Sequence, residues 1–389
     1  MSVYLDNAAS TAIVPAAVAA MTAAWAQPGN PMSLHGAGRQ ARRTLEESRE
    51  SIARSVGARP SEVLFTAGGT ESDNLALKGI YAARHAQDRR RRRIVISAVE
   101  HHAVLDPAES LVAGSGAELV ILPVDRAGRV NPADLRAELE AHADEVALIS
   151  VMWANNEVGA LQPIAELAAT AREFGVPMHS DAIAAVGHVP VDFTASRLSA
   201  LSLAAHKFGG PQGTGALVLG RDVAVAPLQH GGGHERDLRA GTQDVAGAAG
   251  MAAALRLAVD RLEEDTAAVI AVRDRLLAAL ARVDGTTVNS STDGVPGIVH
   301  VSFAGCQGDS LLMLLDAKGV ECSTGSACTS GVASASHVLL AMGLGRSAAR
   351  GSLRFSLGPA NTVAEIDYLA SILDEVCDRA QAAGLTGVR

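Results

Sequence analysis

The chain has 389 residues, of which 48% are hydrophobic and 3% aromatic, and its formal net charge at pH 7 is −9. A chain of this length exceeds the size at which one hydrophobic core keeps growing, so we expect two domains. The negative charge argues against a general nucleic-acid-binding protein, because recognition of phosphates requires a basic surface.

Apolar runs typical of buried strands alternate with helical stretches from about residue 60 to residue 255. Each run ends in polar or Gly-rich residues, as a buried strand does where it enters a loop. This alternation predicts an α/β fold whose mostly parallel sheet is covered by helices on both faces. The predicted strands lie in EVLFTAGG, RIVISAVEHH, AELVILPV, VALISVMWANNEVG, VPMHSDA, LSALSLAAHK and GTGALVLG, with helices such as IAELAATAREFG between them.

The pattern changes at about residue 256. A long helix over residues 262–283 precedes strand candidates at 297–303 and 352–357, and a final helix lies near residues 364–383. We interpret this part as a smaller α/β domain that the N-terminal segment joins. The predicted boundaries give a large domain of residues 15–255 and a small domain of residues 1–14 and 256–389.

Polar clusters follow the predicted strands of the large domain. In open parallel sheets, ligands bind outside the carboxyl ends of the strands, so we expect these clusters to share one crevice. The clusters are Thr70-Glu71-Ser72, Glu100-His101-His102, Asn155-Asn156-Glu157, Asp181 and His206-Lys207.

Asp181 and Lys207 end neighbouring apolar runs, and together they suit a site for pyridoxal phosphate (PLP). In such a site a lysine amine forms a Schiff base, and a carboxylate keeps the pyridine nitrogen protonated so that the ring accepts electrons. Either residue alone is more often a solvated loop residue.

Two further clusters suit the same kind of ligand. Thr70 follows two glycines at the predicted start of a helix, where free N–H groups bind an anion such as phosphate, although a plain N-cap fits equally well. His101 could stack on a flat ring and transfer protons, whereas a solvated histidine is the commoner case. A metal pair of His101 and His102 is disfavoured, because adjacent residues point to different sides, and no metal site is predicted.

The four cysteines form no C-x-x-C pair, and nothing ahead of the fold resembles a signal peptide. The stretch of low polarity at residues 16–26 is too short to span a bilayer. We therefore expect a cytoplasmic protein without a membrane segment, in which a cysteine is catalytic rather than disulfide-bonded.

Cys328 is the best candidate, since it lies in GSACTSG shortly before the helical-looking SHVLLAMG. A Gly-flanked loop near a helix N-terminus favours the thiolate, so the thiol pKa should fall below roughly 8.5. A free cysteine is usually a small buried hydrophobe, but Ser326, Thr329 and Ser330 argue against that here. That plain structural role is assigned to Cys306, Cys322 and Cys377.

The segment GGGHERDLRAGT, residues 231–242, combines three glycines with charged side chains. It cannot pack a core of its own. We expect it at a subunit interface beside the crevice, with a solvent-exposed loop as the alternative.

Residues 89–93 are five consecutive arginines just before the strand IVISA. They are either a solvated loop or a docking patch for an acidic partner, and the sequence does not decide between these.

Taken in order, the motifs resemble those of the NifS/IscS-type cysteine desulfurases of the class V aminotransferase group. The resemblance extends from residue 4 to about residue 359, and it pairs a PLP-lysine motif with a cysteine loop. It implies PLP fold type I and a homodimer whose active sites use residues of both subunits. The matching stretches are YLDNAAST, GNPMSLHGAGR, FTAGGTESDN, EHHAVLD, NNEVG, HSDA, AHKFGGPQGTGAL, HGGGHERDLRAGT, STGSACTSG and RFSLGP.

The resemblance also implies a role for each site residue. Lys207 would be the Schiff-base lysine, and Asp181 the partner of the pyridine nitrogen. His101 would stack on the ring and shuttle protons, and Cys328 would be the nucleophile that accepts sulfur. The remaining assignments are Asn156 near the phenolic oxygen and the substrate, Thr70 and His206 at the phosphate, Thr242 at the phosphate of the other subunit, and Arg354 at the substrate carboxylate.

Two positions depart from the family pattern. Ala184 stands where a glutamine commonly contacts the phenolic oxygen, and Ala204 stands where a serine often contacts the phosphate. Losing such hydrogen bonds weakens cofactor binding by roughly 0.5–1.5 kcal/mol each. Neither position makes or breaks bonds, so we still expect activity.

The implied reaction removes sulfur from L-cysteine, leaving L-alanine and a persulfide on Cys328. The sulfur would then pass to an acceptor protein in iron–sulfur cluster assembly or thiolation. Three alternatives stay open: a selenocysteine lyase or a relative that prefers cysteine sulfinate, another class V PLP enzyme in which Cys328 is structural, and a weakly catalytic sulfur-trafficking scaffold.

Overall fold

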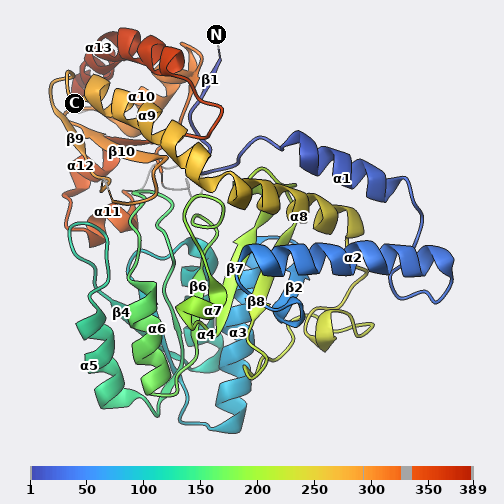
Figure 1. The fold of residues 1–389 in the computed structure, drawn as a ribbon. Coiled ribbons are helices and arrows are strands. Elements are labelled where there is room, and N and C mark those ends of the chain that lie inside the picture. Colours follow the sequence, from blue (N-terminus) through green and yellow to red (C-terminus); the bar gives the residue numbers. More distant parts are fainter. Residues whose placement is uncertain (1, 292, 326–334, 387–389) are drawn as a thin grey trace.

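The computed structural model describes residues 2–291, 293–325 and 335–386, and its centre is a seven-stranded sheet (Figure 1). The strand order is β2-β8-β7-β6-β5-β3-β4, and β8 alone runs antiparallel to its neighbours in this sheet. The mostly parallel α/β sheet predicted from the sequence is therefore confirmed. The strands are β2 (Val63–Thr66), β3 (Arg93–Ser97), β4 (Glu118–Leu122), β5 (Val146–Ser150), β6 (Met178–Asp181), β7 (Ala200–Ala204) and β8 (Gly215–Leu219).

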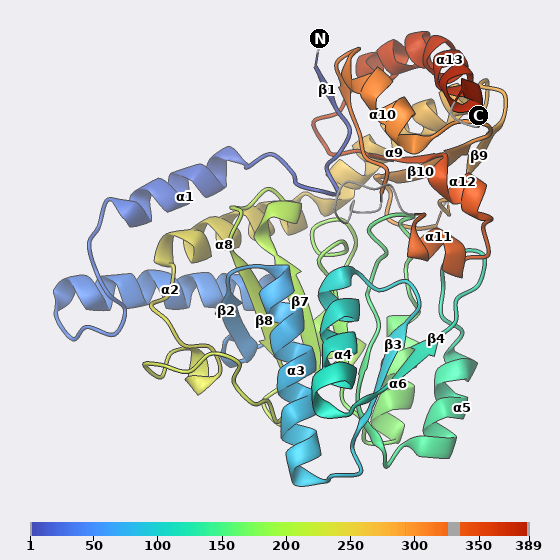
Figure 2. The ribbon, with the colours of Figure 1, turned by 180° about the vertical axis from the view of Figure 1, so that it is seen from behind.

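Helices cover both faces of this sheet, which explains why its inner strands β5, β6 and β7 are buried along their whole length. Because successive side chains of a strand point to opposite faces, Ile94 and Ile96 of β3 pack in one core and Val95 packs in the other. The helices α3 (Gly69–Gln87) and α4 (His102–Ser115) cover the first face, toward the viewer in Figure 2. The opposite core includes α2 (Gly36–Ser55), α5 (Pro132–His142), α6 (Ile164–Glu173) and α8 (Val245–Asp260).

A smaller α/β part packs above the sheet and contains both chain ends (Figure 1). Its strand β10 (Ile298–Phe303) pairs antiparallel with β9 (Thr286–Val288) and β12 (Ser352–Ser356). The N-terminal β1 (Val3–Tyr4) pairs with β11 (Val320–Glu321). The helices of this part are α9 (Leu262–Leu280), α10 (Gly308–Asp316), α11 (His337–Ala341), α12 (Arg346–Arg350) and α13 (Val363–Thr386).

The proposed domain division stays a prediction. Pairing of β1 with β11 suits an N-terminal segment that belongs to the small part. The predicted boundary at residue 255, however, falls inside α8, which continues to Asp260. Two short helices complete the fold, α1 (Pro15–Trp25), which packs on α8, and α7 (Phe193–Ser196). Among the described residues, no helix is both long and apolar enough to cross a membrane.

Candidate active site

A crevice of about 260 Å³ lies at the carboxyl ends of the parallel strands. Six of the predicted site residues line it, so the polar clusters converge as the strand pattern predicted. Apolar side chains close the rest of the surface. The lining residues with predicted roles are Thr70, His101, Asn156, Asp181, His206 and Lys207, and the others include Met152, Ile183, Ala184 and Ala204.

Lys207 ends a 3₁₀ turn, Ala205–Lys207, which directly follows β7. Its Nζ donates to the carbonyl oxygens of Ala8 at 2.6 Å and Ala9 at 3.1 Å. Burial, and then the positive charge of Arg354, lower the pKa of Lys207 to about 8. An amine with this pKa loses its proton near neutral pH and can act as a nucleophile or a base.

Asp181 is the last residue of β6, the strand next to β7. Its Oδ1 accepts a hydrogen bond from the backbone N–H of Ile183 at 2.9 Å. Burial raises the pKa of Asp181, while His101 and Lys207 oppose that rise by stabilising the carboxylate. The carboxylate is thus placed to stabilise a positive charge inside the crevice.

His101 is the N-cap of α4, and its Nδ1 accepts a hydrogen bond from the N–H of Ala103 at 3.0 Å. That bond places the proton of a neutral ring on Nε2. Loss of hydration lowers the pKa of His101, so the ring is mainly neutral at pH 7. A neutral imidazole at the crevice can both stack on a planar ligand and exchange a proton.

The N-terminus of α3 lies at the crevice wall. Gly69 and Thr70 begin this 19-residue helix, whose first backbone N–H groups have no partner within the helix. A Cβ at Gly69 would lie 2.1 Å from Ile183 Cδ1, so a larger residue there would push the Ile183 side chain aside at the crevice wall. His206 lies on the same crevice, and burial lowers its pKa to about 4.

Arg354 lies in β12 of the small part and does not line the crevice itself. Its Nη1 donates to the carbonyl oxygen of Asn156 at 2.9 Å, and its Nη2 donates to Asp6 Oδ1 at 2.6 Å. Its Nε is buried without a partner among the described residues. The guanidinium group is therefore held beside Asn156, which lines the crevice.

A buried polar layer that was not predicted lies next to Asp181. His179 lies two residues earlier in β6, between the hydroxyls of Ser150 and Ser202, each at 2.9 Å. Asp73 Oδ1 of α3 is 3.6 Å from His179 Nε2. Burial and the charge of Asp181 raise the pKa of Asp73 well above its ordinary value. The alternation of side chains along HSDA is the signal that would have placed His179 and Asp181 on one face.

Two predicted residues lie elsewhere. Thr242 is exposed and does not line this crevice, so its assignment to the other subunit stays a prediction. Cys328 lies outside the described residues.

The segment 231–242 is tied to the start of α3 by charged contacts. Glu235 accepts hydrogen bonds from Arg49 Nη1 at 2.7 Å and from the backbone N–H of Phe65 at 2.9 Å. Arg239 Nε donates to Glu71 Oε1 at 2.8 Å, next to Thr70. The segment is therefore anchored to the large domain through Glu235 and Arg239, while six of its twelve residues are exposed, and its place at a subunit interface stays a prediction.

The arginine run is largely neutralised within the chain. Arg90 pairs with Asp88 and Asp144, and Arg93 contacts three glutamates at 2.7 to 3.3 Å. Arg91 donates to the carbonyl oxygens of Ala143 and Val146. These contacts favour a structural role over a docking patch.

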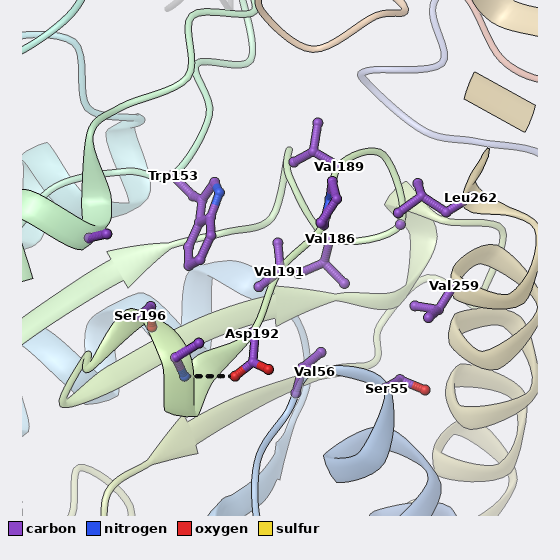
Figure 3. Close-up of a pocket in the computed structure, with 14 residues that line it drawn as sticks. Ser55, Val56, Trp153, Val186, Val189, Val191, Asp192, Ser196, Val259 and Leu262 are labelled. Atoms are coloured by element: carbon purple, nitrogen blue, oxygen red, sulfur yellow. Dashed lines mark hydrogen bonds between the residues drawn. The ribbon is translucent and has the colours of Figure 1, made fainter. Parts of the chain in front are cut away.

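A second hollow of about 430 Å³ lies near Trp153 and is larger than the crevice (Figure 3). Its wall is mainly apolar, with five valines, and the only titratable side chain that lines it is that of Asp192. That carboxylate already caps α7 by accepting from the N–H of Ala195 at 2.8 Å, as the dashed line in Figure 3 shows. The larger hollow therefore offers no uncommitted titratable side chain that could act as an acid or a base.

A mostly parallel sheet that brings a lysine and an aspartate together at neighbouring strand ends, beside a smaller α/β part, defines the type I fold of PLP enzymes. The chain belongs to the aminotransferase class-V family, whose sequence model matches residues 3–369.

Known proteins of this kind match the chain over nearly its full length. It is 57% identical over 385 residues to the IscS-like cysteine desulfurase of Mycobacterium tuberculosis, and the match covers 98% of both chains. A solved NifS-like protein has a TM-score of 0.90 at 33% identity, covering 97% of this chain and 100% of that chain. The structure of SspA in complex with cysteine has a TM-score of 0.80 at 29% identity, covering 93% and 100%.

Proposed function

We propose that the chain is a PLP-dependent cysteine desulfurase, which converts L-cysteine to L-alanine and retains the sulfur as a persulfide on Cys328. The observation that carries the proposal is the crevice itself. It gathers the Lys207 amine, the Asp181 carboxylate and the His101 imidazole at neighbouring strand ends. The full-length similarity to cysteine desulfurases supports the choice of substrate.

The residues at the crevice fit PLP. The volume is close to the roughly 300 Å³ at which small-molecule sites begin. Asp181 would hold the ring nitrogen, and Lys207 would bind the cofactor covalently. Thr70, the start of α3 and His206 would bind the phosphate, with Thr242 of the other subunit. When bound, PLP would supply an electron sink for the bonds that change at the substrate Cα.

Each residue of the chain then has a definite task. Arg354, whose guanidinium group lies beside Asn156, would orient the substrate carboxylate. Asn156 would contact both cofactor and substrate. Once the substrate has displaced it, the Lys207 amine would take the Cα proton, which its pKa of about 8 permits near neutral pH. His101 would assist the movement of protons.

In the sulfur step, the Cys328 thiolate attacks the substrate sulfur. A new S–S bond forms, the substrate C–S bond breaks, and its electron pair stays with the carbon skeleton. That skeleton takes up protons and leaves as alanine, while the sulfur remains as a persulfide. No external oxidant is required.

Replacement of Cys328 tests this scheme directly. Cys328→Ala should keep the yellow chromophore of the bound cofactor but release no sulfide from L-cysteine in the presence of a reductant. The matched control is Cys306→Ala, because Cys306 is buried in the core of the small part and should be dispensable for chemistry. Full activity of Cys328→Ala would refute the scheme, and unchanged turnover of Lys207→Ala would refute the cofactor assignment.

We further propose a cytoplasmic homodimer that passes sulfur to an acceptor protein, an iron–sulfur scaffold or a thiolation carrier. Three buried cysteines are unpaired, which suits a reducing compartment. Incubating the persulfide-loaded enzyme with candidate acceptors, and measuring sulfur transfer by mass spectrometry, would identify the class of acceptor.

A further inference from the structure

The main-chain carbonyl group of Lys207 accepts hydrogen bonds from two separate parts of the fold. Thr11 Oγ1, in the N-terminal segment, donates to the carbonyl oxygen at 2.9 Å. His188 Nε2 lies 2.9 Å from the same oxygen. Because a carbonyl oxygen can only accept, the ring of His188 carries a proton on Nε2. Lys207 is therefore fixed at the point where its side chain leaves the main chain.

His188 belongs to the turn that begins at Asp181. Near the start of this turn, the N–H of Ile183 donates to Asp181 Oδ1 at 2.9 Å. Further along, the N–H of His188 donates to the carbonyl oxygen of Ala185 at 3.0 Å. One hydrogen-bonded turn thus holds the Asp181 carboxylate at its start and contacts the Lys207 carbonyl group near its end.

The bond from His188 does not require a charged ring. Burial lowers the pKa of His188, against the opposing effect of its hydrogen bond to Lys207, so the ring is neutral at pH 7. A neutral donor of similar reach can therefore replace it. The amide N–H of a glutamine meets this requirement, whereas a leucine side chain has no donor.

The residues that follow Lys207 cannot fix it by themselves. Two of the next three residues are glycines, and Gly209 has a φ of 81°. Glycine has more conformational freedom to lose on folding than any other residue. The N-terminal segment supplies two further bonds at 2.9 Å, from the N–H of Thr11 to the carbonyl oxygen of His206 and from the N–H of Val14 to that of Gly209.

We propose that His188 is a positioning residue that ties Lys207 to the turn bearing Asp181, with Thr11 as the second contact. The proposal rests on the proposed binding of PLP by Lys207 and Asp181. Asp181 would hold the ring nitrogen while Lys207 reaches the carbonyl carbon of the cofactor. A fixed separation between the two residues then brings the amine to the atom that it attacks, and such positioning accelerates a reaction.

The test uses three variants of these contacts and one control. His188→Leu removes the donor to Lys207, and His188→Gln keeps one. Thr11→Val removes the hydroxyl group from a side chain of the same shape. The control is His85→Leu, because His85 Nδ1 also bonds a carbonyl oxygen, that of Arg91 at 3.1 Å, but His85 does not line the crevice.

Three quantities are measured on apoprotein. The first is the rate at which added PLP forms its yellow chromophore. The second is the dissociation constant of pyridoxamine phosphate, which has the same ring and phosphate but cannot form a Schiff base with a lysine. The third is amide hydrogen exchange in peptides covering residues 205–210.

We expect His188→Leu to form the chromophore about tenfold more slowly, and Thr11→Val about threefold more slowly, because each loses one hydrogen bond to Lys207. Both variants should exchange residues 205–210 faster. Both should bind pyridoxamine phosphate within about twofold of wild type, since that ligand does not use the lysine amine. His188→Gln should recover most of the wild-type rate, and His85→Leu should match wild type throughout.

Unchanged chromophore formation in His188→Leu would overturn the positioning role. An equal loss of pyridoxamine phosphate binding would also overturn it, because general damage to the crevice would then explain both effects. If borohydride reduction and peptide mapping find no cofactor on Lys207 of wild type, the proposed function fails. Hydrogen exchange still decides the contact in that case, since unchanged exchange of residues 205–210 in His188→Leu would show that His188 does not hold Lys207.

Discussion

Lys207 is the residue whose environment most directly predicts a measurable pH dependence. Its pKa is lowered to about 8, first by burial and then by Arg354. A neutral amine is required to bind PLP covalently. At pH 7 about one amine in ten would be neutral, against roughly one in three thousand at the ordinary pKa of 10.5.

We therefore expect the rate at which apoprotein binds PLP to rise about tenfold per pH unit below pH 8 and to level off above it. The measurement follows the yellow chromophore from pH 6 to pH 10. N-acetyl-lysine, treated in parallel, is the control with an ordinary amine pKa of about 10.4, so its rate should keep rising up to pH 10. A rate for the protein that rises to pH 10 in the same way would contradict the lowered pKa.

Several site residues could be predicted because apolar runs mark where strands end. Asp181 and Lys207 follow adjacent strands, which brings them to one edge of the sheet. Asp6 and the carbonyl groups of Ala8 and Ala9 could not be predicted in this way. They reach Arg354 and Lys207 from the N-terminal segment, and no local spacing encodes so distant a contact.

At the scale of elements, the segment 231–242 depends on a buried ion pair. The Arg49 and Glu235 side chains are 10% and 1% exposed, and Nη1 lies 2.7 Å from Oε2. Glu235, Arg236 and Asp237 all have positive φ, between 44° and 62°. Three consecutive non-glycine residues in this region are costly, so tertiary contacts must hold them.

Glu235→Ala should lower the free energy of unfolding by about 3–5 kcal/mol, because it leaves Arg49 buried without its partner. Urea unfolding measures this loss. The control is Glu173→Ala, which breaks an exposed ion pair with Arg136 at a similar distance of 2.7 Å, and its effect should be much smaller. Equal losses in the two variants would show that burial of the Arg49–Glu235 pair contributes nothing.

The direction of β8 is a feature of the sheet that could not be predicted from its apolar run. The run GTGALVLG indicates a strand but not its direction. Residues 205–214, which join β7 to β8, contain no α-helix, and a connection so short cannot cross over to a parallel strand. Connection length, more than strand composition, therefore explains the one antiparallel strand of the seven-stranded sheet.

At the scale of the whole molecule, the five consecutive arginines of residues 89–93 concentrate positive charge, and the fold brings acidic partners to them from other elements. The arginines of residues 89–93 come from one loop, while their partners come from β4, α5 and the residues just before β5. Ion pairs between separate elements leave no trace in local sequence, and this is why the sequence could not choose between a loop and a docking patch.

Exposed apolar side chains near the N-terminus support the predicted homodimer. Trp25, Met32 and Leu34 are 68%, 54% and 87% exposed. Trp25 is the last residue of α1 and the other two follow it, and α1 projects to the side with α2 and α8 (Figure 1). Large apolar side chains exposed so close together in sequence typically mark a protein interface. The exposed Thr242, assigned to the crevice of the other subunit, also requires a second copy.

Wild type should therefore sediment as a dimer, and the double variant Trp25→Glu, Leu34→Glu should raise the dimer dissociation constant at least ~100-fold, or about 2.8 kcal/mol, because two buried apolar contacts become buried charges. Sedimentation velocity over a range of concentrations measures this. Met313→Glu is the matched control, since Met313 is 73% exposed but lies on α10 of the small part. A monomeric wild type, or equal dissociation in the control, would contradict an interface at this surface. Loss of cofactor phosphate contacts in the monomer should also weaken PLP binding, which links subunit association to a complete active site.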